Sequence, residues 1–325
     1  MAQPRSIRTR YDPDLTRRSA VERGRALNLN RVLVPLSGAS RGEQILPYAS
    51  MITAWFHGEL TLFHSLPPTH HVRGVLSSTI NYPDAPHDRG TSLATSYLEE
   101  VISRLSPHGI QARWGLASGD PAPMIASRSV TSSIGLVAMA ISARTRPHRF
   151  FAPGLLDHLW KRTTAPLLIV NPNHRTLNEA SPAPPTKLIL PYKDEATAAA
   201  FPYASAIAGT SRAEIIVCTK GTSHDRSEID SIVENLNSDG IQADHQETML
   251  QYSEAVAEIQ SNNPGSWIVV GSRMRSGFTR AVFGSLADIL ARDASGPILI
   301  VPERRIRRRR ERAARALTRE LATSN

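Results

Sequence analysis

The residues best suited to chemistry lie in one loop near the end of the chain, between Gly271 and Ser285. The loop follows a short apolar run, Trp267 to Val270, whose β-branched residues are typical of a buried parallel strand. Gly284 and Ser285 stand where apolar residues begin to recur at helical spacing. A strand, a glycine-bearing loop and a helix N-terminus present backbone N–H groups and a positive dipole end to a ligand. The pattern therefore predicts a phosphate-binding site.

The spacing in this loop is specific. It runs Gly271, two residues, Met274, nine residues, then Gly284-Ser285, and it resembles the G-x2-G-x9-G-[ST] nucleotide loop of the universal stress protein family. Met274 replaces the second glycine of that pattern. The resemblance covers nearly all of residues 31–302, once in each half, through VLVPLSG and LILPYKD, two PYAS segments, GDPA at 119–122, and the terminal strands LLIVNP and ILIVPE.

The resemblance implies a fold and a role. It implies two α/β domains in tandem, each a doubly wound parallel five-stranded sheet of the adenine-nucleotide alpha hydrolase-like type with strand order 3-2-1-4-5. It implies an internal pseudo-dimer packed through the last strands, with a homodimer of whole chains as a further option. It also implies a stress-response protein, regulatory or binding rather than catalytic, because some family members bind ATP and others do not.

The family's nucleotide residues carry over mainly to the second half. Lys193, two positions after Pro191, stands where ATP-binding members have an aspartate, and Asp194 follows it. ATP or a related adenine nucleotide is the expected ligand. The predicted binding residues are Gly271, Ser272, Arg273, Gly284, Ser285, Pro191 and Lys193.

The first half departs further from the motif. Pro153-Gly154 stands in place of the Gly-Ser pair, which removes a backbone donor and a hydroxyl, and Ser37 replaces the aspartate. The first half is therefore expected to have lost nucleotide binding and to keep the fold, so that the chain has at most one adenine-nucleotide site.

Alternating buried strands and amphipathic helices by themselves indicate parallel, doubly wound sheets. We expect a basic N-terminal arm over 1–30, with a short helix left open, a first domain over 31–172 and a linker over 173–186. A second domain over 187–302 and an arginine-rich tail over 303–325 follow. The second half lacks a proline-rich loop at 66–90, which is therefore an insertion in the first domain.

Charge is concentrated at the two ends of the chain. The net charge is +9 overall, whereas residues 31–302 alone are close to neutral. The run from Arg304 to Arg319 predicts a basic helical tail. An alternative function is therefore a nucleotide-independent scaffold that docks on a protein, a nucleic acid or an anionic surface through this tail.

Other chemistry is not indicated. No paired carboxylates or Ser-His-Asp set stands at suitable spacing, so we predict no catalytic residue and no turnover enzyme, with weak ATP hydrolysis left open. His70, His71 and His87 are interpreted as surface residues rather than metal ligands, because no carboxylate stands at ligand spacing. The single cysteine, Cys218, excludes an internal disulfide and, with no apolar segment of membrane-spanning length, indicates the cytoplasm.

Overall fold

The computed structural model describes most of the two predicted domains. The described residues are 19–66, 85–141, 155–172, 182–194, 196–221, 226–272 and 285–303. Among them, no helix is long and apolar enough to cross a membrane.

The first half alternates strands and helices. Its elements are α2 (Ala20–Ala26), β1 (Arg31–Pro35), α3 (Ser40–Glu43), α4 (Leu46–Trp55), β2 (Glu59–Leu66), α5 (Ala85–Leu105), η1 (Ser106–His108), β3 (Ala112–Ser118), α6 (Pro121–Thr131), β4 (Leu136–Ala140), α7 (Leu155–Arg162) and β5 (Leu167–Val170).

The second half repeats this order. Its elements are β6 (Lys187–Pro191), η3 (Thr197–Ala200), α8 (Phe201–Ser211), β7 (Glu214–Lys220), α9 (Arg226–Ser238), β8 (Ala243–Thr248), α10 (Tyr252–Asn262), β9 (Trp267–Ser272), α11 (Ser285–Asp293) and β10 (Ile298–Pro302).

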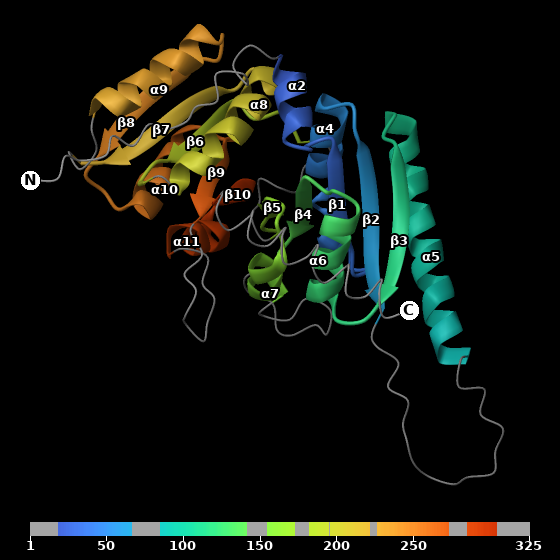
Figure 1. Cartoon of the computed structure of the whole chain (residues 1–325). Coiled ribbons are helices and arrows are strands. Elements are labelled where there is room, and N and C mark those ends of the chain that lie inside the picture. Colours follow the sequence, from blue (N-terminus) through green and yellow to red (C-terminus); the bar gives the residue numbers. More distant parts are fainter. Residues whose placement is uncertain are drawn as a thin grey trace, which may run out of the picture.

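All ten strands form one sheet, in the order β3-β2-β1-β4-β5-β10-β9-β6-β7-β8 (Figure 1). Within each half the strands are parallel, and each half has the predicted order 3-2-1-4-5. The halves join through their last strands, β5 and β10, which are antiparallel. The predicted fold class is confirmed, and its two sheets are continuous with each other.

The pairing register identifies equivalent residues in the two halves. Arg31 pairs with Glu59 in the first half, and Lys187 pairs with Glu214 in the second. Both pairs are also ion pairs, at 3.9 Å and 3.0 Å. Pro35 is therefore equivalent to Pro191. Leu136 is equivalent to Trp267, because Leu136 pairs with the second residue of β1 and Trp267 pairs with the second residue of β6.

Helices cover both faces of the sheet. Buried side chains of α4, α5, α8 and α9 form one apolar cluster with the strands, and those of α6, α7, α10 and α11 form a second on the opposite face. Trp267 contributes to the contact between halves: its ring centroid lies 5.8 Å from that of Tyr48 and 6.1 Å from that of Trp55. Both partners belong to α4 in the first half.

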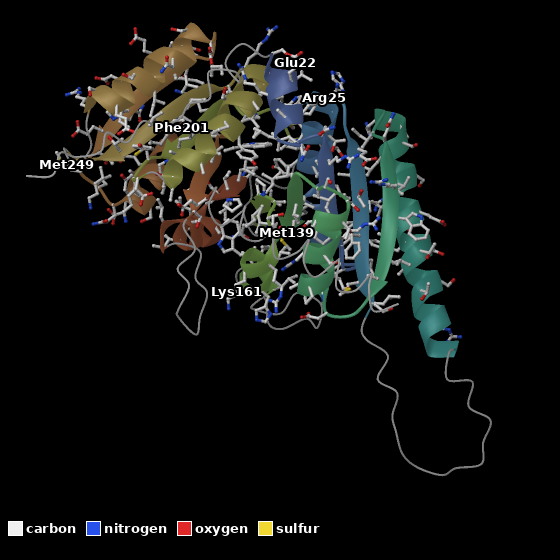
Figure 2. The ribbon with its side chains drawn as sticks, viewed as in Figure 1. Glu22, Arg25, Met139, Lys161, Phe201 and Met249 are labelled. Atoms are coloured by element: carbon white, nitrogen blue, oxygen red, sulfur yellow. The ribbon has the colours of Figure 1, made fainter. Side chains whose placement is uncertain are left out.

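The short helix left open within the N-terminal arm is present as α2, which folds onto both halves (Figure 1). Ser19 and Glu22 form a capping box that starts the helix. The side chain of Arg25 donates from Nε to the Phe56 carbonyl, at 3.2 Å, where α4 ends. On the other side, a Cβ added at Gly209 of α8 would lie 2.8 Å from the Ala20 side chain. Figure 2 labels Glu22 and Arg25 on this helix.

The extent of the insertion needs correction. Helix α5 begins at Ala85, so the last residues of the supposed 66–90 loop are helical; Pro86 fits there because a first-turn residue needs no N–H partner. The rest of the insertion, 67–84, lies outside the described residues.

Candidate functional site

The carboxyl ends of β6 and β9 lie side by side. These are the first and fourth strands of the second half, and the winding of the sheet reverses between them. Ligands of doubly wound sheets bind at this point. The structure thus brings Pro191, which ends β6, and Gly271 and Ser272, which end β9, to one edge. Lys193 follows two residues after Pro191 and is exposed.

Gly271 has a packing role at this edge. A Cβ added there would lie 2.6 Å from the Cα of Thr197 and would also overlap the carbonyl oxygen of Ala196. Both contacts are to backbone, which moves less easily than the end of a side chain. Glycine at this position therefore allows η3 to lie directly on β9.

The loop after β6 is closed by its own hydrogen bonds. The Thr197 hydroxyl oxygen accepts from the backbone N–H groups of Lys193 and Asp194, each at 2.9 Å, and the hydroxyl donates to the Asp194 carbonyl at 2.6 Å. Oδ1 of Asp194 accepts from the N–H groups of Ala196 and Thr197, at 3.0 and 3.2 Å. These backbone donors, and this carboxylate oxygen, are engaged within the loop.

The remaining predicted residues are placed less fully. Ser272 is buried, and its carbonyl accepts from the N–H of Glu303 at 3.2 Å. Ser285 is the first residue of α11, and its side chain is not among those described. Arg273 and Gly284 lie outside the described residues, as does Met274.

Sequence reasoning missed Tyr252, which stands close to this site. Its hydroxyl donates to the carbonyl of Tyr192, at 2.6 Å, and accepts from the N–H of Lys220, at 3.3 Å. Burial raises the pKa of the Tyr252 phenol. Tyr192 lies between the predicted residues Pro191 and Lys193, so Tyr252 contacts the site from α10. No local signal marks it: Tyr252 begins α10 where Pro121 begins the equivalent helix α6, and its partner Tyr192 is sixty residues away.

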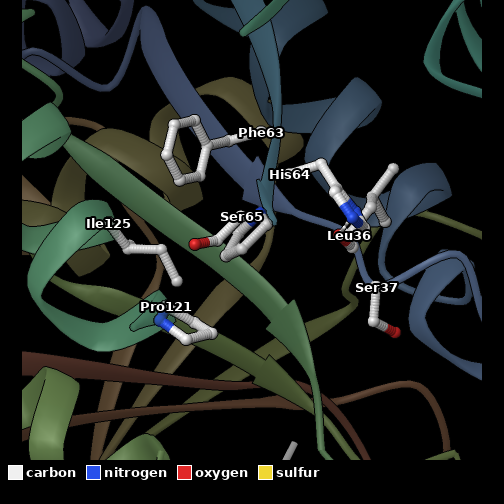
Figure 3. Close-up of a pocket in the computed structure, with 8 residues that line it drawn as sticks. Leu36, Ser37, Phe63, His64, Ser65, Pro121 and Ile125 are labelled. Atoms are coloured by element: carbon white, nitrogen blue, oxygen red, sulfur yellow. Dashed lines mark hydrogen bonds between the residues drawn. The ribbon is translucent and has the colours of Figure 1, made fainter. Parts of the chain in front are cut away.

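The same edge of the first half contains a small pocket of about 20 Å³, room for about one water molecule (Figure 3). Pro121 and Ile125 of α6 border it on one side and Ser37 on the other. His64 fixes the loop after β1 through a 2.8 Å hydrogen bond between its Nδ1 and the Leu36 carbonyl oxygen. The pocket is lined by Pro35, Leu36, Ser37, Phe63, His64, Ser65, Pro121 and Ile125.

Comparison with known proteins resolves the type of domain. The model of the universal stress protein family matches residues 188–302. The matched residues make up nearly the whole of the second half. A comparison of the sequence with curated proteins finds no match.

Solved structures are similar in fold over both halves. A universal stress protein from Archaeoglobus fulgidus DSM 4304 is 16% identical, and the match covers 84% of this chain and 98% of that one with a TM-score of 0.66. A functionally unknown protein from Pseudomonas aeruginosa PAO1 is 14% identical, with coverage of 90% and 99% and a TM-score of 0.59. At these identities the shared property is the fold.

Two groups of side chains on β7 are unsuited to nucleophilic chemistry. Burial raises the pKa of the Cys218 thiol to about 11, so the thiol is protonated at neutral pH and is a poor nucleophile. Oγ1 of Thr219 lies 2.7 Å from Nε2 of His245, and Asp230 lies 4.0 Å from the other ring nitrogen. Thr219 is only 2% exposed, so this hydroxyl is not open to a substrate. Among the described residues no His, Cys, Asp and Glu cluster is suited to a metal.

Proposed function

We propose that the chain is a tandem universal stress protein of the cytoplasm, which acts in stress response by binding rather than by turnover. Its second half takes at most one adenine nucleotide, ATP or a relative, over Gly271, Ser272, Arg273, Gly284 and Ser285, with Pro191 and Lys193 opposite. The observation that carries the proposal is the match of residues 188–302 to the family, in the half whose β9 leads through the glycine-bearing loop into α11.

The order of elements supports one way in which a nucleotide would be held. The N-terminus of α11 and the preceding loop would receive the phosphates through backbone N–H groups. The exposed ammonium of Lys193 would add a charge-assisted contact. Asp194 would not take the role of the family's aspartate with its Oδ1, because that oxygen is already bound by two backbone N–H groups.

Calorimetric titration of the full chain with ATP, ADP and AMP tests the site. Gly284→Val is expected to abolish binding by blocking approach of the phosphates, and Met274→Gly to tighten it by restoring the missing glycine. The matched control is Gly154→Val in the first half, which should leave affinity unchanged. Binding that survives Gly284→Val but is lost in Gly154→Val would show that the site lies in the first half, contrary to the proposal.

The absence of turnover is tested separately. The wild type and Gly284→Val should release phosphate from ATP at the same background rate. Release that is faster in the wild type than in the variant would make the protein an ATP-hydrolysing enzyme.

The basic tail supports a second candidate, docking on a nucleic acid or anionic surface. Residues 304–325 carry nine arginines and two glutamates, so removing them lowers the net charge of +9 by seven. The intact chain should then bind DNA, RNA or acidic vesicles with an affinity that falls steeply with salt, and the truncated chain should bind none of them. Equal retention of both chains on a polyanion column would dispose of this candidate.

A further inference from the structure

Tyr252 and Pro121 occupy equivalent places in the two halves. Ala112 pairs with Leu60, and Ala243 pairs with Ile215, which fixes β3 and β8 in the same register. Pro121 is the first residue of α6 and follows Ala112 by nine positions. Tyr252 is the first residue of α10 and follows Ala243 by nine positions. The two halves therefore offer a direct comparison of a proline and a tyrosine at one point of the fold.

The two residues leave different space over the strand ends. Pro121 borders the small pocket over the ends of β1 and β2 (Figure 3). Tyr252 instead extends across the ends of β6 and β7: its hydroxyl is bonded to Tyr192, just after β6, and to Lys220, the last residue of β7.

The Tyr252 ring is held firmly in this position. The 2.6 Å bond to the Tyr192 carbonyl is short for a hydroxyl donor, and the ring is half-buried. The carbonyl it satisfies is equivalent to that of Leu36, which His64 satisfies from β2 in the first half. Moving the ring aside would leave the Tyr192 carbonyl without this partner.

We infer that Tyr252 limits the size of the ligand site in the second half. Its ring fills the space over the carboxyl ends of β6 and β7, which the flat purine ring of a nucleotide would otherwise enter. A ligand held at Gly271 and Pro191 extends toward β7 only as far as this ring. The inference rests on the proposed nucleotide site and names the side chain that sets its size.

Two substitutions separate the volume of the ring from its hydrogen bonds. Tyr252→Pro recreates the residue of the first half, and proline is tolerated at the first position of a helix. Tyr252→Phe keeps the ring and removes the hydroxyl. By calorimetry with ATP and with adenosine, Tyr252→Pro should bind about tenfold more tightly than the wild type, which corresponds to ~1.4 kcal/mol. Tyr252→Phe should stay within about threefold of the wild type.

The first half supplies the reciprocal control. Pro121→Tyr fills the first-half pocket and should leave nucleotide affinity unchanged. If Tyr252→Pro has a lowered thermal midpoint, Tyr252→Ala repeats the measurement without a constraint on the helix backbone. A larger hollow beside Tyr192 in the crystal structure of either variant is expected as well.

Each outcome bears on a different claim. Equal affinity of the wild type, Tyr252→Pro and Tyr252→Ala, with binding abolished by Gly284→Val, would overturn the role of Tyr252 and leave the nucleotide site standing. Weaker binding in all three Tyr252 variants would also overturn it, because the hydroxyl would then be organising the site. Failure of every protein, including Tyr252→Pro, to bind adenosine or ATP would overturn both the inference and the proposed function.

Discussion

The two halves share the same backbone hydrogen bonds after their first strands but use different side chains to complete them. The N–H of Leu36 donates to the Phe63 carbonyl at 2.8 Å, and the N–H of Tyr192 donates to the Cys218 carbonyl at the same distance. The carbonyls of Leu36 and Tyr192 are then satisfied by unlike side chains, His64 from β2 and Tyr252 from α10.

This difference shows what a duplicated fold constrains. A buried carbonyl requires a donor, because leaving it unpaired costs about 1–3 kcal/mol, but any donor within reach will serve. The backbone bonds therefore persist while the side chain that completes them changes. The change alters the volume over the strand ends, and that volume decides what each edge can accept.

The largest expected effect on stability concerns a position at which the halves differ: the second half has Trp267 where the first half has Leu136. Trp267 is fully buried and contacts two rings of the first half, so Trp267→Ala should lower the free energy of unfolding by about 4 kcal/mol. Urea unfolding monitored by circular dichroism measures this loss. Trp114→Ala on edge strand β3 is the control and should cost under about 1 kcal/mol, since that side chain is 38% exposed. Similar losses in both variants would show that Trp267 does not link the halves.

The second effect concerns Gly271 and its first-half equivalent, Ala140. Gly271→Ala should destabilise the protein by about 3 kcal/mol, because the new Cβ meets the backbone of Ala196 and Thr197. Ala140→Gly, the reverse exchange, should cost only about 1 kcal/mol through added chain entropy. Thermal unfolding of the two variants side by side measures the difference. A loss for Gly271→Ala no greater than that for Ala140→Gly would mean that η3 does not lie tightly on β9.

Much of the fold could be predicted from the sequence because its signals are local and repeated. Apolar β-branched runs such as Trp267 to Val270 mark buried parallel strands, and the second copy of each segment fixes the order of elements. Helix α2 was harder to predict. Its stability comes from Phe56, which follows α4 and lies against Gly24, and from Ala20 packed on Gly209. These partners lie far from α2 in the sequence, and the helix's own short apolar pattern is weak.

The candidate site was less predictable than the fold. The motif identifies Gly271 as a ligand residue, yet the structure gives this glycine a packing reason through Thr197, which no spacing rule contains. Asp194 is next to the family's aspartate position, but its carboxylate caps the following turn. Tyr252 was missed because its contact with Tyr192 joins two elements that are sixty residues apart.

A third prediction concerns the closed loop after β6. Thr197→Val removes the hydroxyl that holds the N–H groups of Lys193 and Asp194, and it should cost about 2 kcal/mol. Hydrogen exchange should show these two amides opening faster, with those of β6 unchanged. Thr53→Val in α4 is the matched control: its buried hydroxyl only donates to the carbonyl one turn earlier, so its loss should be nearly neutral. Equal effects of the two variants would indicate that Thr197 does not organise the loop.

The smallest effect distinguishes Cys218 from Phe63, which occupy the same register beside Pro191 and Pro35. Burial raises the pKa of the Cys218 thiol from 9.0 to about 11, so the folded state keeps a proton that the unfolded state loses first. The stability from the neutral thiol is therefore complete below pH 9.0 and is lost as the pH rises toward about 11. Cys218→Val lacks this titration, so between those pH values the stability of the wild type should fall more steeply than that of the variant. Parallel profiles from urea unfolding would show that the thiol is not shielded from water, and alkylation of native Cys218 at neutral pH would lead to the same conclusion.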